Sequence, residues 1–219
     1  MQDYEMDNLK KRLSSIMEKF SRLKHCDRNY EIFGASSHEY QFNKIIDKTS
    51  IDEFEAKFNV QLPGDYKLFL LEAGNGGAGP FYGVLPFEKC LFSDIDYPNA
   101  KFLLDPSLPF PYHEKWNIDN PLNGEDDEQD EQLEAFEKEY FDDKHVNGTI
   151  RICNYGCGHF INLVVKGEEY SHIWSDDRAS DYGIYPFCDF NYHDQARLTF
   201  FDWYEGWIEK SLSELTDKD

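Results

Sequence analysis

The sequence predicts an α+β fold in which helices pack on a mainly antiparallel sheet. Apolar residues recur at helical spacing near the start of the chain, over residues 7–24, and again near its end, over residues 199–212. Between them, residues 149–187 hold short aromatic and β-branched runs that glycine-containing turns separate. Helices that precede and follow a run of strands, without alternating with them, are typical of the α+β class.

The N-terminal part of the chain predicts three helices. The first has one apolar face, made by Leu9, Leu13, Ile16, Phe20 and Leu23. A second, short helix is expected to begin at Ser50, because Glu53 stands three residues later and completes a capping box. A third begins at Pro63, since proline is tolerated in a first helical turn. A short strand is expected near Tyr40.

The segment Gly74-Asn75-Gly76-Gly77-Ala78-Gly79 matches the letters of a dinucleotide-binding loop, G-x-G-x-x-G. Such a loop follows a strand and opens a helix, so that the helix N-terminus faces the phosphates. Here a helix precedes it, and the aromatic run 81–87 predicts a strand after it. We therefore expect a tight turn in which the backbone passes close to its neighbours, with Gly74 left-handed at the helix end.

The middle of the chain differs in character from its two ends. Residues 93–120 form a loop punctuated by prolines, and residues 119–143 then hold 12 acids and one lysine. The acids crowd the first turn of a predicted helix, where the helix dipole favours them, and Leu133, Phe136 and Tyr140 share one face. We expect a docked acidic helix, within an elaboration over residues 93–147 of a single domain that spans residues 1–219.

The C-terminal third predicts an antiparallel meander closed by a helix. Four strands are expected, over residues 149–154, 159–165, 172–176 and 182–187. Thr199 is suited to cap the last helix. One face of that helix is aromatic and is expected to close the core; it comprises Phe200, Trp203, Tyr204, Trp207 and Ser211.

Charge and composition exclude several classes of protein. The net charge is −21, which is opposite to what a phosphate-binding surface needs, so direct nucleic-acid binding is not expected. No run of 18 apolar residues predicts a membrane span, and the first residues show no export signal. Five cysteines, an odd number, do not make a disulfide framework, so a cytoplasmic location with reduced thiols is expected.

The best metal candidate is Cys153-x-x-x-Cys157-x-His159, which Cys188 and His193 would complete as a zinc site. The same cysteines and histidines leave open a thiol hydrolase, although no local signature marks a nucleophile. Against both stands the ordinary role of a strand cysteine as a small buried apolar residue. We predict no catalytic residue, no metal and no cofactor.

Several blocks of sequence together carry a family resemblance. They are FEAKFNVQLPGDYKLFLLEAGNGGAGPFYGVLPFE, then GTIRICNYGCGHFINLVVKGEE, IWSDDR, GIYPF and TFFDWYEGWI. This series resembles the SUKH superfamily, also called the cell-wall-assembly-regulator-like family. In that family a helix with L-P-x-x-Y-x-x-F-L leads into a G-N-G-G-x-G-P-x-Y-G turn. The match spans about residues 38–92 and 148–212.

The resemblance implies a SUKH-like α+β domain without catalytic residues. Many bacterial members are immunity proteins that bind and neutralise a polymorphic toxin, frequently a nuclease, and fungal members regulate cell-wall assembly. A nuclease attracts phosphate, so a cognate toxin with a basic surface would suit this acidic chain. The hypotheses are a cytoplasmic immunity protein, a regulatory protein-binding module, or a zinc or thiol hydrolase. The sequence does not predict an oligomeric state.

Two candidate partner-binding patches follow from that hypothesis. The first is the acidic run, comprising Glu125, Asp126, Asp127, Glu128, Asp130 and Glu131. The second lies at a predicted strand end and comprises Trp174, Asp176 and Asp177. A carboxylate pair at a strand end also fits acid–base chemistry, cation binding or, most simply, a solvated turn.

Overall fold

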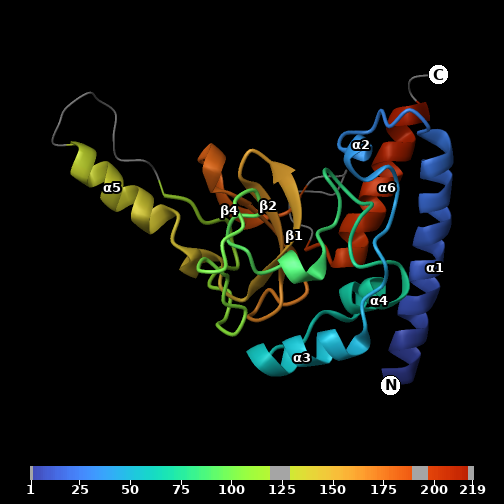
Figure 1. The fold of residues 1–219 in the computed structure, drawn as a ribbon, viewed down its shortest axis with the longest axis horizontal. Helices are drawn as coiled ribbons and strands as arrows, with labels where there is room; N and C mark the ends of the chain where they lie inside the picture. Colours follow the sequence, from blue (N-terminus) through green and yellow to red (C-terminus); the bar gives the residue numbers. More distant parts are fainter. Residues whose placement is uncertain (1, 119–128, 189–196, 217–219) are drawn as a thin grey trace.

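A four-stranded sheet lies beside a layer of helices that come from both ends of the chain (Figure 1). The computed structural model describes residues 2–118, 129–188 and 197–216. The α-helices are α1 (Gln2–Cys26), α2 (Ala35–His38), α3 (Lys48–Phe58), α4 (Gly64–Glu72), α5 (Gln129–Tyr140) and α6 (Phe200–Thr216). The strands are β1 (Thr149–Gly156), β2 (His159–Val164), β3 (Ile173–Asp177) and β4 (Gly183–Pro186). Three 3-10 helices are η1 (Phe87–Lys89), η2 (Asp143–Val146) and η3 (Arg178–Ser180). The predicted α+β class is confirmed.

The sheet is the predicted meander. Its strands lie in the order β1-β2-β3-β4, and each is antiparallel to the next. The register pairs Ile161 with Ser175 and Ser175 with Tyr185, so these side chains share one face of the sheet. The neighbouring pairs Asn162–Trp174 and Trp174–Pro186 point to the opposite face.

The helical layer joins the first and last helices of the described chain. α1 and α6 lie side by side in Figure 1 and run in the same direction, since Arg12 pairs with Asp202 at 2.7 Å and Lys19 pairs with Glu209 at 2.5 Å. Phe200, Trp203 and the rest of the predicted aromatic face of α6 are buried, so this helix closes the core as expected. None of the helices in the described ranges combines the length and apolar character needed to cross a bilayer.

Each face of the sheet has its own hydrophobic cluster. Ile152, Leu163 and Ile173 belong to the larger cluster, together with the buried faces of α1, α4 and α6. Val164, Trp174 and Ile184 point to the other face and pack against Leu104, Phe110 and Val146 from the segment between η1 and β1. Both faces of the sheet are therefore buried along most of these strands.

The predicted acidic helix exists as α5, but it docks less than expected. Among residues 131–140 only Tyr140, at the C-terminal end, is buried, whereas Leu133 and Phe136 are half-buried. In Figure 1 α5 extends away from the sheet. Its apolar face is short, because acidic residues separate the few apolar ones, so its N-terminal part has little to bury.

The glycine-rich segment is a tight turn, as predicted, but two details of the prediction were wrong. Gly74 does not adopt a left-handed conformation; a β-carbon there would lie 2.8 Å from Phe42 Cβ, so close packing is what requires glycine. The expected strand over 81–87 is reduced to isolated bridges from Val84 to Gly77 and Cys153. Positive φ angles at Phe81 (55°) and Gly83 (98°) interrupt the extended backbone.

Two further local predictions need correction. The N-cap of α3 is Asp47, whose carboxylate accepts from Thr49 N at 2.8 Å, so the helix begins before the predicted Ser50–Glu53 capping box. The strand expected near Tyr40 is a single bridge from Phe42 to Gly77.

Stability is expected to fall by roughly 1–2 kcal/mol between pH 7 and pH 5 because of His38. Burial lowers the pKa of His38 to about 4, and its Nδ1 accepts from Tyr40 N at 3.0 Å. In the unfolded chain the imidazole takes up a proton near pH 6.5, whereas in the folded chain it does so only near pH 4. The folded state therefore loses stability as the pH falls from about 6.5 towards 4. Urea unfolding of the parent and of His38→Asn at both pH values measures the effect.

At pH 7 the difference in free energy of unfolding between the two proteins measures the packing lost in the variant. The change in that difference between pH 7 and pH 5 measures the effect of protonating His38. The asparagine oxygen can still accept from Tyr40 N, so the backbone contact is matched. The same pH dependence in both proteins would contradict a neutral, buried His38.

Candidate functional site

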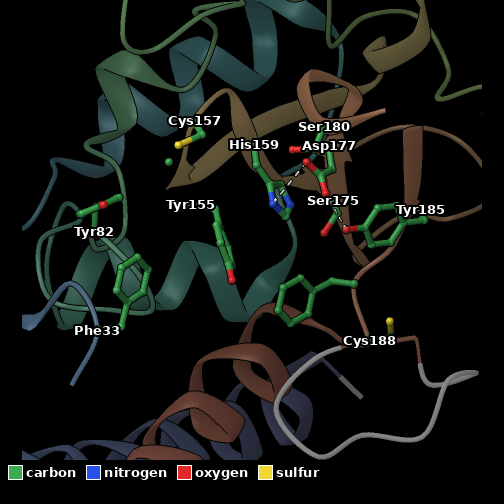
Figure 2. Close-up of a pocket in the computed structure, with 12 residues that line it drawn as sticks. Phe33, Tyr82, Tyr155, Cys157, His159, Ser175, Asp177, Ser180, Tyr185 and Cys188 are labelled. Carbon is green, nitrogen blue, oxygen red and sulfur yellow. Dashed lines mark hydrogen bonds and ion pairs between the residues drawn. The ribbon is translucent and has the colours of Figure 1, made fainter. Parts of the chain in front are cut away.

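A pocket of about 740 Å³ opens where the β1–β2 turn meets the ends of β3 and β4 (Figure 2). We call it the aromatic pocket. Its lining comprises Phe33, Tyr82, Tyr155, Gly156, Cys157, His159, Ser175, Asp177, Ser180, Tyr185, Phe187 and Cys188. The strand residues among them lie on the sheet face that carries the helices, beyond the area that α6 covers.

The period of the strands explains which polar side chains reach this pocket. Ser175 and Asp177 are two residues apart on β3, so both point to the same face. Tyr185 on β4 pairs with Ser175, and His159 begins β2 on the same side. Asp176, one residue out of phase, points to the opposite face.

One side of the pocket is a row of aromatic rings from three segments far apart in the sequence. Phe33 precedes α2, Tyr82 follows the glycine-rich turn, and Tyr155 is the penultimate residue of β1. In Figure 2 Tyr155 lies between Phe33 and His159. The ring centroids are 5.4 Å apart for Phe33–Tyr82 and 4.6 Å apart for Tyr155–His159, whose rings are stacked. Phe33 is 55% exposed and Tyr82 47%, so the row presents apolar surface to solvent.

The polar side of the pocket contains a carboxylate and an imidazole. Burial lowers the pKa of His159, although the charges of Asp177 and Asp176 oppose the shift, so its ring is neutral at pH 7. His159 Nδ1 lies 3.8 Å from Asp177 Oδ1, too far for a hydrogen bond. Burial, and then the charge of Asp177, raise the pKa of Tyr185, whose hydroxyl donates to Asp177 Oδ2 at 3.3 Å.

Of the second predicted patch, only Asp177 lies at this site. Trp174 is 0% exposed and Asp176 is 3% exposed, so neither lies on the surface as expected. The segment over the opposite face of the sheet covers both of them, and the sequence alone did not show where that segment packs. The solvated turn considered for this stretch is also wrong, since Asp177 and Arg178 are buried too.

Asp176 instead belongs to a buried charge cluster with Arg151 and Arg178. Its Oδ2 accepts from Arg151 at 2.8 Å, and its Oδ1 from Arg178 Nε at 2.6 Å. Burial alone would raise the pKa of Asp176, but the two arginine charges outweigh burial and hold it well below its usual range. Arg178 also donates to the backbone oxygens of Tyr140 and Asp142, so the cluster ties the sheet to the end of α5.

The first predicted patch is only partly described. Residues 125–128, which comprise Glu125, Asp126, Asp127 and Glu128, lie outside the described residues. Asp130 lies in α5, and Glu131 is an exposed residue of the same helix. The binding role of this patch stays a prediction.

Cys157, His159 and Cys188 all line the aromatic pocket, but they do not form a metal site in the described residues. Cys153 is buried and donates to Pro80 O at 3.2 Å, whereas Cys157 and Cys188 are exposed. Burial raises the pKa of the Cys153 thiol, which makes it a poor nucleophile. Within residues 2–118, 129–188 and 197–216 no three His, Cys, Asp or Glu side chains gather as a metal site would require. The fifth ligand candidate, His193, is outside these ranges.

The comparison with protein families gives a decisive match. The model of the SMI1/KNR4 family (SUKH-1) matches residues 45–200, more than half of the chain. The chain belongs to the SMI1/KNR4 family. The matched range includes the glycine-rich turn and all four strands, and so most of the aromatic pocket. No curated protein and no solved structure gave a match.

Sequence analysis did not find the aromatic row of this SUKH-1 chain. Phe33, Tyr82 and Tyr155 stand in or beside turns, where large aromatic side chains are usually not needed for a core. The position of three large aromatic residues at turns was the one feature of the sequence that could have indicated a binding site, but it did not show that the three rings lie together.

Proposed function

We propose that this SUKH-1 chain is a non-catalytic immunity protein that binds and neutralises a toxin in the cytoplasm. The observation that carries the proposal is the aromatic row beside a buried carboxylate. Tyrosine and other aromatic residues are enriched among the side chains that dominate protein–protein binding energy. Three such exposed rings, with Phe33 in contact with both tyrosines, offer a site for a macromolecule on a chain whose family is generally non-catalytic.

The strong negative charge supports a basic partner. The net charge is −21, and Glu131, Glu134 and Glu137 are exposed on α5, which extends away from the sheet. Such a field speeds association with a positively charged surface. A nuclease toxin carries such a surface where it binds phosphate, so occupation of that groove would exclude the nucleic acid.

Neutralisation is tested with the product of a toxin-domain gene adjacent to the gene for this chain. Titrating the chain into the purified toxin should abolish toxin activity at an equimolar ratio, since inhibition is by binding and not by turnover. Full activity at a molar excess of the chain would contradict the proposal. Capture of a cell-wall regulator by the chain, in place of the toxin, would favour the regulatory module.

Neutralising part of the acidic run should weaken toxin binding about tenfold at low salt, mainly by slowing association. The variant carries serine at Asp126, Asp127 and Glu128. A matched control carries serine at Glu53, Glu72 and Glu168, three exposed acids elsewhere, and so has the same net charge. Surface plasmon resonance gives both rate constants. If the two variants bind alike, the acidic run is not part of the interface.

A further inference from the structure

Asp177 is a buried carboxylate with an unsatisfied oxygen. The residue is 7% exposed, and Oδ2 accepts from the Tyr185 hydroxyl. Oδ1 has no hydrogen-bond partner among the described residues. A buried carboxylate oxygen without a donor is costly, and it favours a cationic donor that comes from outside.

Nothing that lines the aromatic pocket neutralises this charge. None of its described lining residues is lysine or arginine. His159 is the nearest group that could be cationic, but it is neutral at pH 7 for the reason given above. The contrast with Asp176 is sharp, because that neighbouring carboxylate has two arginine partners at hydrogen-bond distance.

The chemistry of the walls favours a planar cation. Tyr155 and Tyr185 both line the pocket, and aromatic faces attract cations, guanidinium groups in particular. The Lys115 ammonium lies 5.6 Å from the ring centroid of Tyr185, outside the pocket lining, and His159 stacks on Tyr155 at 4.6 Å, so the face of Tyr155 is uncovered only when the imidazole shifts. His159 Nε2 also has no partner among the described residues, and it is an acceptor in the tautomer that carries its proton on Nδ1. Two separated acceptors between aromatic walls match a guanidinium, which has five N–H donors in a flat fork, better than an ammonium.

The geometry points to an arginine side chain of the protein partner as the occupant of the aromatic pocket, with Asp177 as its counter-ion. This inference rests on the proposed function only in assigning the arginine to a toxin. Oδ1 lies 3.8 Å from His159 Nδ1, so binding of the guanidinium requires the imidazole to shift away from it. The pocket would then bind one specific basic residue of the partner, while the acidic run attracts the basic surface of the partner over a longer distance.

The test uses the chain alone and a small probe, N-acetyl-arginine methylamide. Amide signals of the ¹⁵N-labelled chain should shift saturably at residues 155–159 and 175–185, with a Kd of roughly 1–10 mM, as expected for so small a ligand. The uncharged citrulline analogue, which has nearly the same shape, should cause no saturable shift. Asp177→Asn should weaken the arginine probe at least tenfold.

Two further variants make the result decisive. Glu168→Gln removes the same charge from an exposed site in the β2–β3 turn, at the opposite end of these strands, and should leave Kd unchanged. Tyr155→Leu removes one aromatic wall without touching the carboxylate and should weaken the probe about threefold; it decides the matter if Asp177→Asn does not fold. No saturable shift, equal binding of citrulline, or wild-type affinity in the folded pocket variants would overturn the inference. Because no toxin is present, such a failure leaves the neutralisation assay unaffected.

Discussion

Asp176→Asn should destabilise the chain by about 3–5 kcal/mol, the usual cost of leaving buried charges unpaired. This carboxylate is the shared anion of Arg151 and Arg178, and all three side chains are almost fully buried. The amide keeps the shape but removes the charge that compensates both arginines. Guanidinium unfolding monitored by tryptophan fluorescence, with the slope compared between variants, measures the loss.

Removing one arginine partner of Asp176 should cost less stability than removing the charge of Asp176 itself. Arg151→Met leaves Arg178 in place, with bonds of 2.6 and 2.8 Å to the carboxylate, so we expect a loss of about 1–3 kcal/mol. Asp181→Asn, at an exposed position four residues beyond β3, is the matched control and should change stability by less than about 0.5 kcal/mol. If Asp176→Asn proves no worse than Arg151→Met, the carboxylate is not the common counter-ion.

Gly77→Ala is expected to destabilise the chain by about 3 kcal/mol or more. Gly77 has φ +98°, and an added β-carbon would lie 2.5 Å from Gln41 O and 2.9 Å from Phe42 Cα. These are backbone atoms, which cannot move aside as a flexible side chain would. Gly77 also exchanges two hydrogen bonds of 2.8 Å with Val84, so displacing it disturbs the link to β1. Thermal and urea unfolding should both report the loss.

Gly64→Ala is the matched control for that variant. Gly64 begins α4 with an ordinary φ, and an added β-carbon would meet only the end of the Leu9 side chain, at 3.2 Å. Alanine favours the helix and lowers the entropy of the unfolded chain, so stability should stay the same or rise by up to about 1 kcal/mol. Equal losses for both variants would show that the turn does not depend on the backbone geometry of Gly77.

The regular elements were predictable because each has a strong local pattern. The helical periodicity around Leu13 and Phe20 and the alternating strands after Gly148 are properties of short windows of sequence. Local signals failed where tertiary contacts decide, as in the segment from Phe81 to Pro86. There the chain is pinned by Gly77 and β1 and leaves the extended conformation.

The site was much less predictable than the fold. Its aromatic row depends on the approach of Phe33, Tyr82 and Tyr155, which are separated by many residues and share no motif. Trp174 and Asp176 were expected at the surface, because nothing local shows that the segment before β1 covers that side of the sheet. Cys157, His159 and Cys188 were considered only as zinc or thiol candidates. Asp177 was expected as part of an exposed patch, so the sequence did not predict that it shares a pocket with them.

The side-by-side arrangement of α1 and α6 has a consequence for synthesis on the ribosome. Arg12 and Lys19 find their carboxylate partners on a helix about 190 residues later, and the same helix supplies much of the aromatic core. α1 therefore cannot complete the burial of its apolar stripe until α6 has been synthesised. Until then part of that stripe is open to chaperones, and a nascent chain halted before residue 200 would leave it exposed.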